Sequence, residues 1–249
     1  MEVAARERDF VRVAGPDAAD YLQRMVSNDV EALTAGEACP ALLLTAKARL
    51  IAPIVVLRRG DEDFLLLTEP GLGEVVRAHL TRMRLRAQCE IEPETHESAL
   101  VFGASTGFTT DWPGAREAVD ADLKATLSDD DLELRRIERG VPRWEHELDD
   151  RILPAEAGLD RTHISFSKGC YPGQEPVARL HFRGHPNRGL RVLELDEVPE
   201  HDAPLLHDGR EVGRVTSAMR RPDGSVVALA YVRTEVPDDA PFALATRTS

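Results

Sequence analysis

The hydrophobic positions of this chain alternate between strand-like and helix-like spacing, which predicts a mixed α+β fold. Two β-rich runs, residues 41–45 and 50–57, precede a third at 64–68, and the polar stretch before the third run indicates a hairpin. Apolar residues spaced three and four apart predict helices at residues 18–25 and 73–86. This order of elements is not the repeating βαβ pattern of a doubly wound sheet, so we expect an α+β architecture.

Weaker patterns complete the first three quarters of the chain. The remaining predicted strands and helix fall at residues 10–13, 88–91, 100–102 and 132–139. The helix at 73–86 is expected to bury Val75, Val76, Leu80 and Met83 on one face. Residues 103–123 are rich in turn formers and show no clear period, so no element is predicted there.

The character of the sequence changes after residue 186. Four short apolar runs follow, and Asp208-Gly209 and Asp223-Gly224 separate neighbouring runs. Asp-Gly between two strands is a strong hairpin signal, because both positions tolerate positive φ. We therefore expect residues 187–249 to form a small antiparallel β module after an α+β region at residues 1–186.

Composition and charge narrow the class of protein. The net charge of the 249 residues is −13, which argues against a nucleic-acid or anionic-membrane binder, since both need a positive field. The three cysteines are far apart and form no CxxC pair, which is typical of a reducing compartment. No apolar run reaches the roughly 18–20 residues of a membrane span. We expect a soluble, cytoplasmic protein.

The densest chemistry lies at residues 168–175, Lys-Gly-Cys-Tyr-Pro-Gly-Gln-Glu. Cys170 stands just before a predicted helix start, near unpaired backbone N–H groups, and Lys168 adds a positive charge; both favour a thiolate. The thiolate could act as a nucleophile or bind a soft metal, although one cysteine is too few to hold an iron–sulfur cluster permanently. The alternative is a tight turn with an inert cysteine, which the crowding of reactive residues makes the weaker interpretation.

Other charged residues are less specific. Arg179, Arg183 and Arg188 are spaced to surround one anion, but a solvated helix face is an equally good interpretation of each arginine alone. Glu138 could grip the edge of a heterocycle, although its residue type alone better suits a surface salt bridge. The chain contains no metal-ligand spacing, phosphate loop or GxSxG elbow, so no metal site is predicted.

The cysteine motif resembles the signature of the YgfZ family, folate-binding proteins of iron–sulfur protein maturation or repair that are related to the glycine-cleavage T-protein. The resemblance extends over nearly the whole chain, through residues 15–30, 136–142, 153–159, 178–184, 213–217 and 228–232. It implies α+β folate-binding domains around a central channel, with a barrel-like C-terminal module. The region 1–186 would then hold two subdomains, interleaved in sequence, with a ferredoxin-like part near residues 40–100.

The resemblance also implies roles for single residues. Cys170 and Lys168 match the functional pair of the family, and Glu138 matches the T-protein glutamate that contacts the pteridine ring. The other residues that the family pattern places at the tetrahydrofolate site are Arg179, Arg183, Gln174, Glu175, Asn28 and Tyr171. One departure stands out: the T-protein loop that ends in a catalytic aspartate corresponds here to residues 47–53, which contain no acid. Aminomethyl transfer needs a carboxylate beside the reacting folate nitrogen, so this activity is in doubt.

Three functions follow from these residues and the resemblance. The leading hypothesis is a tetrahydrofolate-binding accessory protein, a monomer that uses Cys170 to assist iron–sulfur client proteins or assembly factors and binds neither nucleic acid nor membrane. The alternatives are a folate-dependent one-carbon transferase or demethylase with Cys170 as nucleophile, and a folate-binding module without chemistry. Whether the protein is an enzyme is left open.

Overall fold

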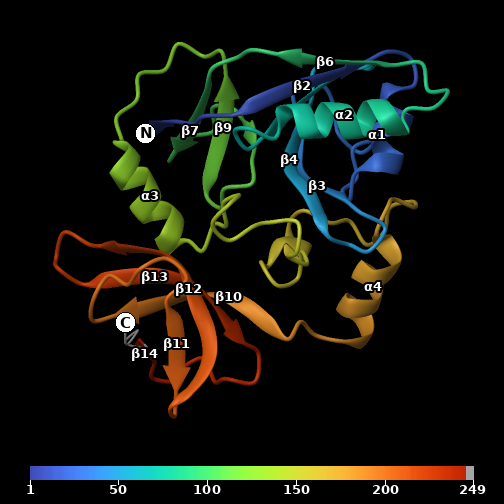
Figure 1. Cartoon of the computed structure of the whole chain (residues 1–249). Coiled ribbons are helices and arrows are strands. Elements are labelled where there is room, and N and C mark those ends of the chain that lie inside the picture. Colours follow the sequence, from blue (N-terminus) through green and yellow to red (C-terminus); the bar gives the residue numbers. More distant parts are fainter. Residues whose placement is uncertain (245–249) are drawn as a thin grey trace.

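The computed structural model describes residues 1–244, which form three antiparallel sheets and four α-helices (Figure 1). The central sheet has the strand order β3-β4-β5-β2-β6. Its strands are β2 (Asp9–Ala14), β3 (Ala38–Leu44), β4 (Leu50–Arg58), β5 (Asp63–Thr68) and β6 (Glu90–Glu94). Most residues of β3, β4 and β5 are buried on both faces, because other elements cover each side of the sheet.

Helices α1 (Ala18–Met25) and α2 (Gly73–Met83) cover one face of the central sheet. The apolar stripe of α1 recurs at helical spacing, and the Tyr21 hydroxyl donates a 2.6 Å hydrogen bond to the carbonyl of Leu80 on α2. The prediction for α2 was partly wrong. Val76 and Leu80 are buried, whereas Val75 and Met83 are 44% and 40% exposed, because the helix contacts the sheet with a narrower face.

A second sheet, with the order β1-β7-β9-β8, packs on the other face of the central sheet. Its strands are β1 (Glu2–Ala5), β7 (Ser98–Phe102), β8 (Phe108–Thr109) and β9 (Ala115–Val119). Phe108 of β8 lies in a cluster with buried side chains of the central sheet. Strands β8 and β9 fall inside residues 103–123, where the sequence indicated no element, since their pairing depends on β7 and not on a local pattern.

The third sheet lies at the C-terminal end, below the other two in Figure 1. Its order is β10-β13-β12-β11-β14, with β10 (Arg188–Leu195), β11 (Pro204–His207), β12 (Arg210–Arg220), β13 (Val226–Arg233) and β14 (Ala243–Leu244). His207 pairs with Arg210, so Asp208 and Gly209 form a two-residue turn with φ of 50° and 72°. These angles are those of the predicted Asp-Gly hairpin.

Three further elements join the sheets. Helix α3 (Asp129–Glu138) packs its Ile137 on the C-terminal sheet, and a capping box between Ser128 and Asp131 fixes its start. A short 3₁₀ turn, η1 (Leu159–Arg161), and helix α4 (Gln174–Arg183) follow along a long connecting segment. This segment runs through the middle of the molecule, and α3 and α4 lie on opposite sides of it (Figure 1). No helix of residues 1–244 is both long and apolar enough to cross a membrane.

Candidate functional site

The cysteine motif occupies the exposed turn that leads into α4. Cys170 is exposed, whereas Cys89 is buried and Cys39 is half-buried. Helix α4 starts at Gln174, so the thiol lies four residues before the helix, and Pro176 falls within the first turn, where proline costs no backbone hydrogen bond. Of the three thiols, only that of Cys170 is freely open to a partner molecule.

Gly173 docks this motif on the turn between β3 and β4. Its φ is +84°, and a Cβ built on it would lie 2.6 Å from the carbonyl oxygen of Thr45 and 3.2 Å from the Cα of Ala48. Only glycine fits both the backbone angle and the close approach. According to the family resemblance, the turn that Gly173 touches carries the catalytic acid in the T-protein. In this chain the turn starts with the residues Thr45-Ala46-Lys47-Ala48-Arg49.

Lys168 is directed away from solvent toward the end of α1. Its ammonium donates hydrogen bonds to the carbonyl oxygens of Gln23 and, at 2.6 Å, Val26, and it lies 5.1 Å from the centre of the Tyr171 ring. A cation at the C-terminal end of a helix satisfies carbonyls that have no partner within the helix. Burial lowers the pKa of Lys168 to about 8, although Asp29 acts in the opposite direction. The ammonium of Lys168 therefore binds the C-terminal end of α1, and this geometry suits a residue with a positioning role.

Ser27 and Asn28, which follow α1, hold the segment that precedes the motif. The Ser27 hydroxyl donates to the carbonyl of His163 at 2.6 Å and accepts from the amide of Leu42. The Asn28 side chain donates to the carbonyl of Pro40 at 2.7 Å and of Thr162 at 3.2 Å. Both bonds of the Asn28 amide are therefore structural, and its role at a tetrahydrofolate site stays a prediction. Ser27 was missed, because a lone serine gives no signal in a sequence.

Tyr171 belongs to the core beneath the motif. Its side chain is buried with Leu42, Leu44 and Val177, and burial raises the pKa of its hydroxyl to about 12. Gln174 is half-buried and Glu175 is exposed, both in the first turn of α4. Tyr171 therefore supports the motif from below, while Gln174 and Glu175 are the polar groups next to the cysteine turn.

A cavity of about 420 Å³ runs along α4, and residues 168–175 of the motif are not among those that line it. Its apolar walls come from residues 153–155 and from Pro176, Val177 and Leu180. Four cations line it, Lys47 and Arg49 from the turn after β3, and Arg179 and Arg183 from α4. In residues 1–244 none of these four cations forms an ion pair, although most of the ion pairs there use arginine.

One carboxylate shares this cavity with the four cations. Asp160 lines its wall, and its oxygen lies 3.7 Å from the ring nitrogen of His181. The volume is in the usual range for small-molecule sites, and an apolar wall with a few charged groups is their common composition. The residues fit an amphipathic ligand that has an apolar part and an anionic end.

Two predicted residues lie elsewhere. Glu138, at the end of α3, is exposed and accepts a 2.6 Å hydrogen bond from Arg221 of the C-terminal sheet. Arg188 is paired with Glu156 at 3.1 Å and lies 5.0 Å from the centre of the Tyr231 ring. The structure thus places Arg179 and Arg183 on the wall of the cavity along α4, but not Arg188 or Glu138.

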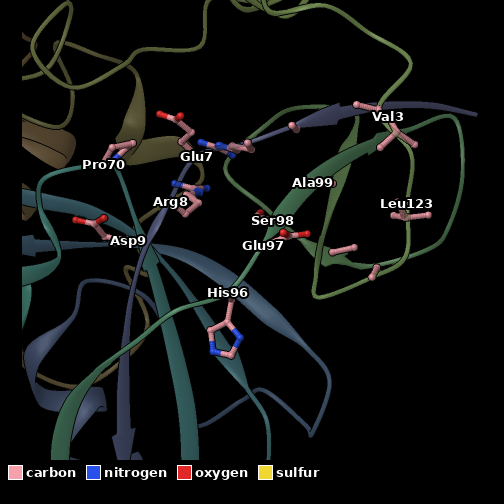
Figure 2. A pocket seen from close by; sticks show the side chains of 15 residues that line it. Val3, Glu7, Arg8, Asp9, Pro70, His96, Glu97, Ser98, Ala99 and Leu123 are labelled. Atoms are coloured by element: carbon pink, nitrogen blue, oxygen red, sulfur yellow. The ribbon is translucent and has the colours of Figure 1, made fainter.

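A buried cluster of charges, which the sequence did not reveal, lies where β1 crosses to β2. Glu117 has a fully buried side chain and accepts 3.0 Å hydrogen bonds from the Arg8 guanidinium, and Arg6 and Arg8 both bond to Asp111. Burial alone would raise the pKa of Glu117, but Arg8 and Arg6 hold it below its usual range. A cavity of about 590 Å³ lies beside this cluster, with Arg8, Asp9 and Pro70 at its left side and His96 at its lower end in Figure 2. The charged side chains of this cluster are paired with one another, so we interpret the cluster as structural.

The described residues 1–244 contain no group of three or more His, Cys, Asp and Glu side chains able to hold a metal ion. His163, on the segment next to the motif, is buried, and burial lowers its pKa to about 4 although Asp111 opposes the shift. It is therefore neutral at physiological pH.

Comparison with known proteins agrees with this architecture. The glycine cleavage T-protein N-terminal domain matches residues 8–103, and the glycine cleavage T-protein C-terminal barrel domain matches residues 188–248. Together they cover more than half of the chain, which belongs to the glycine cleavage T-protein family. A solved structure, the glycine cleavage system aminomethyltransferase T from Bartonella henselae, shares the fold, with a TM-score of 0.78 over 93% of this chain and 78% of that one, at 17% identity.

Relatives with several different names are similar over most of the chain. A "tRNA-modifying protein YgfZ" of Edwardsiella ictaluri is 28% identical, over 92% of this chain and 83% of its own length. An "iron-sulfur cluster assembly factor IBA57 homolog, mitochondrial" of Pyricularia oryzae is 27% identical, over 90% of this chain and 64% of its own length. An "aminomethyltransferase" of Rubrobacter xylanophilus is 26% identical, over 90% and 74%. The expected fold and family are thus confirmed.

Proposed function

We propose that this protein binds tetrahydrofolate in the cavity along α4 and assists the assembly or repair of iron–sulfur proteins through the thiol of Cys170. The observation that carries the proposal is the position of Cys170. It is an exposed thiol on a turn whose Gly173 contacts Thr45 and Ala48, and Ala48 also lines the cavity along α4, which is lined by four cations. The printed name of the IBA57 relative supports the iron–sulfur context.

The residues of the cavity divide the work of holding a folate. Arg179 and Arg183 lie four residues apart on α4, so both can face the carboxylates of the glutamate tail, and a guanidinium suits a carboxylate well. The apolar side chains of Val177 and Leu180 would contact the aromatic part. The folate would supply a carrier for one-carbon units, while the side chains bind and orient it.

The ring end of a folate needs a carboxylate that accepts hydrogen bonds from its N–C–N edge. The cavity contains Asp160, whereas the carboxylate predicted from the family resemblance, Glu138, is bonded to Arg221 near the C-terminal sheet. We therefore propose Asp160 for this role. Replacing Asp160 by Asn should weaken tetrahydrofolate binding by roughly 1.5–3 kcal/mol, the usual contribution of a charge-assisted hydrogen bond. Glu138→Gln is the matched variant, and a loss of affinity in Glu138→Gln alone would return the role to Glu138.

Aminomethyl transfer has less support. The turn from Thr45 to Arg49 approaches the motif but carries two cations and no carboxylate. A carboxylate beside the reacting nitrogen is the group that would assist proton transfer in that reaction. We therefore place the activity at Cys170 and expect no steady turnover of a methylated amine by the purified protein.

Isothermal titration with tetrahydrofolate tests the binding, and absence of heat at millimolar ligand would exclude a folate site. The role of the thiol is tested by expressing Cys170→Ser in cells that lack the native protein and measuring the activity of iron–sulfur enzymes. We expect loss of those activities with normal protein levels. Cys39→Ser, which replaces a half-buried thiol, is the control, and the iron–sulfur enzymes should keep their activities in cells that express it. Full activity with Cys170→Ser would contradict the proposed role.

A further inference from the structure

An apolar groove of about 680 Å³ lies where α1 meets the end of α2 and the turn that follows it, at the upper right of Figure 1. None of its lining residues belongs to the cavity along α4, so the two hollows are separate. Tyr21 and Met25 of α1 are almost fully buried and form its floor. We call this hollow the α1–α2 groove, and the residues that define it are Tyr21, Arg24, Met25, Met83, Leu85 and Arg86.

Leu85 is held in solvent by a backbone conformation that leucine rarely adopts. Leu85 is 89% exposed, and its φ is +52°, in the left-handed region that bulky residues avoid. Met83 beside it is 40% exposed. Because apolar surface stabilises a protein only when it leaves water, Leu85 contributes little to the fold in this position. A strained residue that displays an apolar side chain at a groove indicates a surface that a partner covers.

Positive charge surrounds the groove on a chain that is acidic overall. Residues 75–89 contain four arginines and no acidic residue, although the net charge of the protein is −13. Arg82 and Arg86 are both exposed, and within residues 1–244 neither forms an ion pair. Asp17, which also lines the groove, accepts a 2.7 Å hydrogen bond from the amide of Gln88. The charge that complements this surface is therefore negative.

We propose that the α1–α2 groove is the docking site for an acidic amphipathic helix of a partner protein. Its apolar side chains cover Met83 and Leu85, and its carboxylates face the arginines. An amphipathic helix in an apolar groove is a recurring mode of recognition, with anchors three and four residues apart. A lipid surface fits less well, because a flat bilayer does not reach the buried Tyr21 and Met25, and anionic lipids repel a chain of net charge −13. The proposal goes beyond the proposed function and involves neither folate nor Cys170.

The test uses a fluorescein-labelled peptide of about 18 residues, a length that supports a helix, with leucine at helical spacing on one face and glutamate on the others. Its fluorescence anisotropy is measured with the purified full chain, beside a peptide in which lysine replaces every glutamate. We expect the acidic peptide to bind about 10-fold more tightly than the basic one at low ionic strength, because several exposed ion pairs form. The difference should shrink at about 0.5 M salt, which screens exposed charges. Equal affinity of the two peptides at low salt, or no binding of the acidic peptide at millimolar concentration, would overturn the proposal.

Variants locate the binding in the groove. Leu85→Gly removes the side chain and suits the positive φ, so the protein should fold normally. It should bind the acidic peptide about 10- to 100-fold more weakly, the effect of losing one buried leucine side chain. Val198→Gly removes a 45% exposed apolar side chain outside the groove and should keep the affinity. Unchanged affinity in Leu85→Gly would contradict the assignment.

The arginine is tested in the same way. Arg86→Gln should weaken binding of the acidic peptide about 2- to 5-fold at low salt, as expected for one exposed ion pair. Arg210→Gln makes the same replacement at an exposed position outside the groove and should have no effect. Equal affinities of these two variants would remove Arg86 from the docking surface.

Other occupants of the groove give different results. Flotation with vesicles of phosphatidylserine and phosphatidylcholine tests a lipid surface, and vesicle binding that Leu85→Gly abolishes, without binding of the acidic peptide, would reject the partner helix. A dimer of the native chain in sedimentation that Leu85→Gly dissociates would assign the groove to a second copy and also overturn the proposal. Cys170→Ser should leave the affinity for the peptide unchanged, so failure of this inference and failure of the proposed function are told apart.

Discussion

Lys168 shows how a residue that looks catalytic in the sequence can serve a neighbouring element. Its side chain is 9% exposed, and its ammonium holds the carbonyls of Gln23 and Val26 at the end of α1. A lysine two positions before a reactive cysteine suggests an activator, but the direction of its side chain is a tertiary property. At the same scale, Cys170 is exposed because the turn around it faces solvent, and Tyr171 is buried next to it.

Replacing Lys168 by Met should lower the free energy of unfolding by about 1–3 kcal/mol, because two carbonyls at the end of α1 lose their charged donor. Urea unfolding measures this, and Lys124→Met, at an exposed lysine, should change it by no more than about 0.5 kcal/mol. Equal stability of the two variants would show that the contact with α1 contributes nothing.

The same residue predicts a pH dependence. Its pKa is lowered to about 8 in the folded protein, below the value of 10.5 expected for an unfolded lysine. Between these values the unfolded chain holds more protons than the folded protein, so the stability contributed by this group rises with pH. The difference in unfolding free energy between the native protein and Lys168→Met should therefore grow from pH 8 to pH 10. A difference that shrinks over this range would contradict the assignment.

At the scale of elements, the site depends on one close contact between α4 and the turn after β3. Gly173→Ala places a methyl group against the Thr45 carbonyl at a φ of +84°, so the turn or the helix start must move. We expect a loss of about 1–3 kcal/mol of stability and weaker folate binding. Gly169→Ala is the matched control, since no atom lies within 4 Å of its added Cβ. Similar behaviour of both variants, measured by thermal unfolding and titration, would show that the contact does not position the motif.

At the scale of the whole molecule, His96 joins two sheets beside the cavity of Figure 2. Its two ring nitrogens lie 2.7 Å from a carboxylate oxygen of Glu94, on β6, and 2.6 Å from one of Asp120, next to β9. Carboxylates only accept, so both nitrogens must carry protons. Burial by itself would lower the pKa of His96, but the bonds to Glu94 and Asp120 raise it.

This bridge predicts that stability falls as the imidazolium loses its proton. Because the folded pKa lies above the unfolded value, the contribution is fully present below about pH 6.5 and is lost as the pH rises through the folded pKa. His96→Gln should cost on the order of 1 kcal/mol at pH 5.5, since Asp120 is partly screened by solvent, and less at pH 9. Urea unfolding of both proteins at each pH measures the effect. A cost that is independent of pH would exclude the charged bridge.

Local patterns in the sequence were sufficient for much of the fold. Apolar spacing predicted α1, α2 with three residues too many, the hairpin of β4 and β5, and the C-terminal strands with the Asp208-Gly209 turn, because each depends on neighbours in the chain. Strand β1 was missed because its partner β7 is far away in sequence, with Glu2 opposite Phe102. Strands β8 and β9 were missed because they are short and lie in a turn-rich stretch without an alternating pattern, although they pair with near neighbours. The family signature in residues 168–175 was also visible, since its residue types are rarely found together.

The sequence by itself thus determined the α+β class, the family and the presence of the cysteine motif, all of which depend on residue type and spacing. Only the tertiary structure decided what surrounds the motif. It turned Lys168 toward α1, placed Lys47, Arg49, Arg179 and Arg183 around one cavity and left Glu138 with Arg221. The physical reason is that side-chain direction and long-range contact are set by packing between segments more than eighty residues apart, and spacing along a chain carries no record of them.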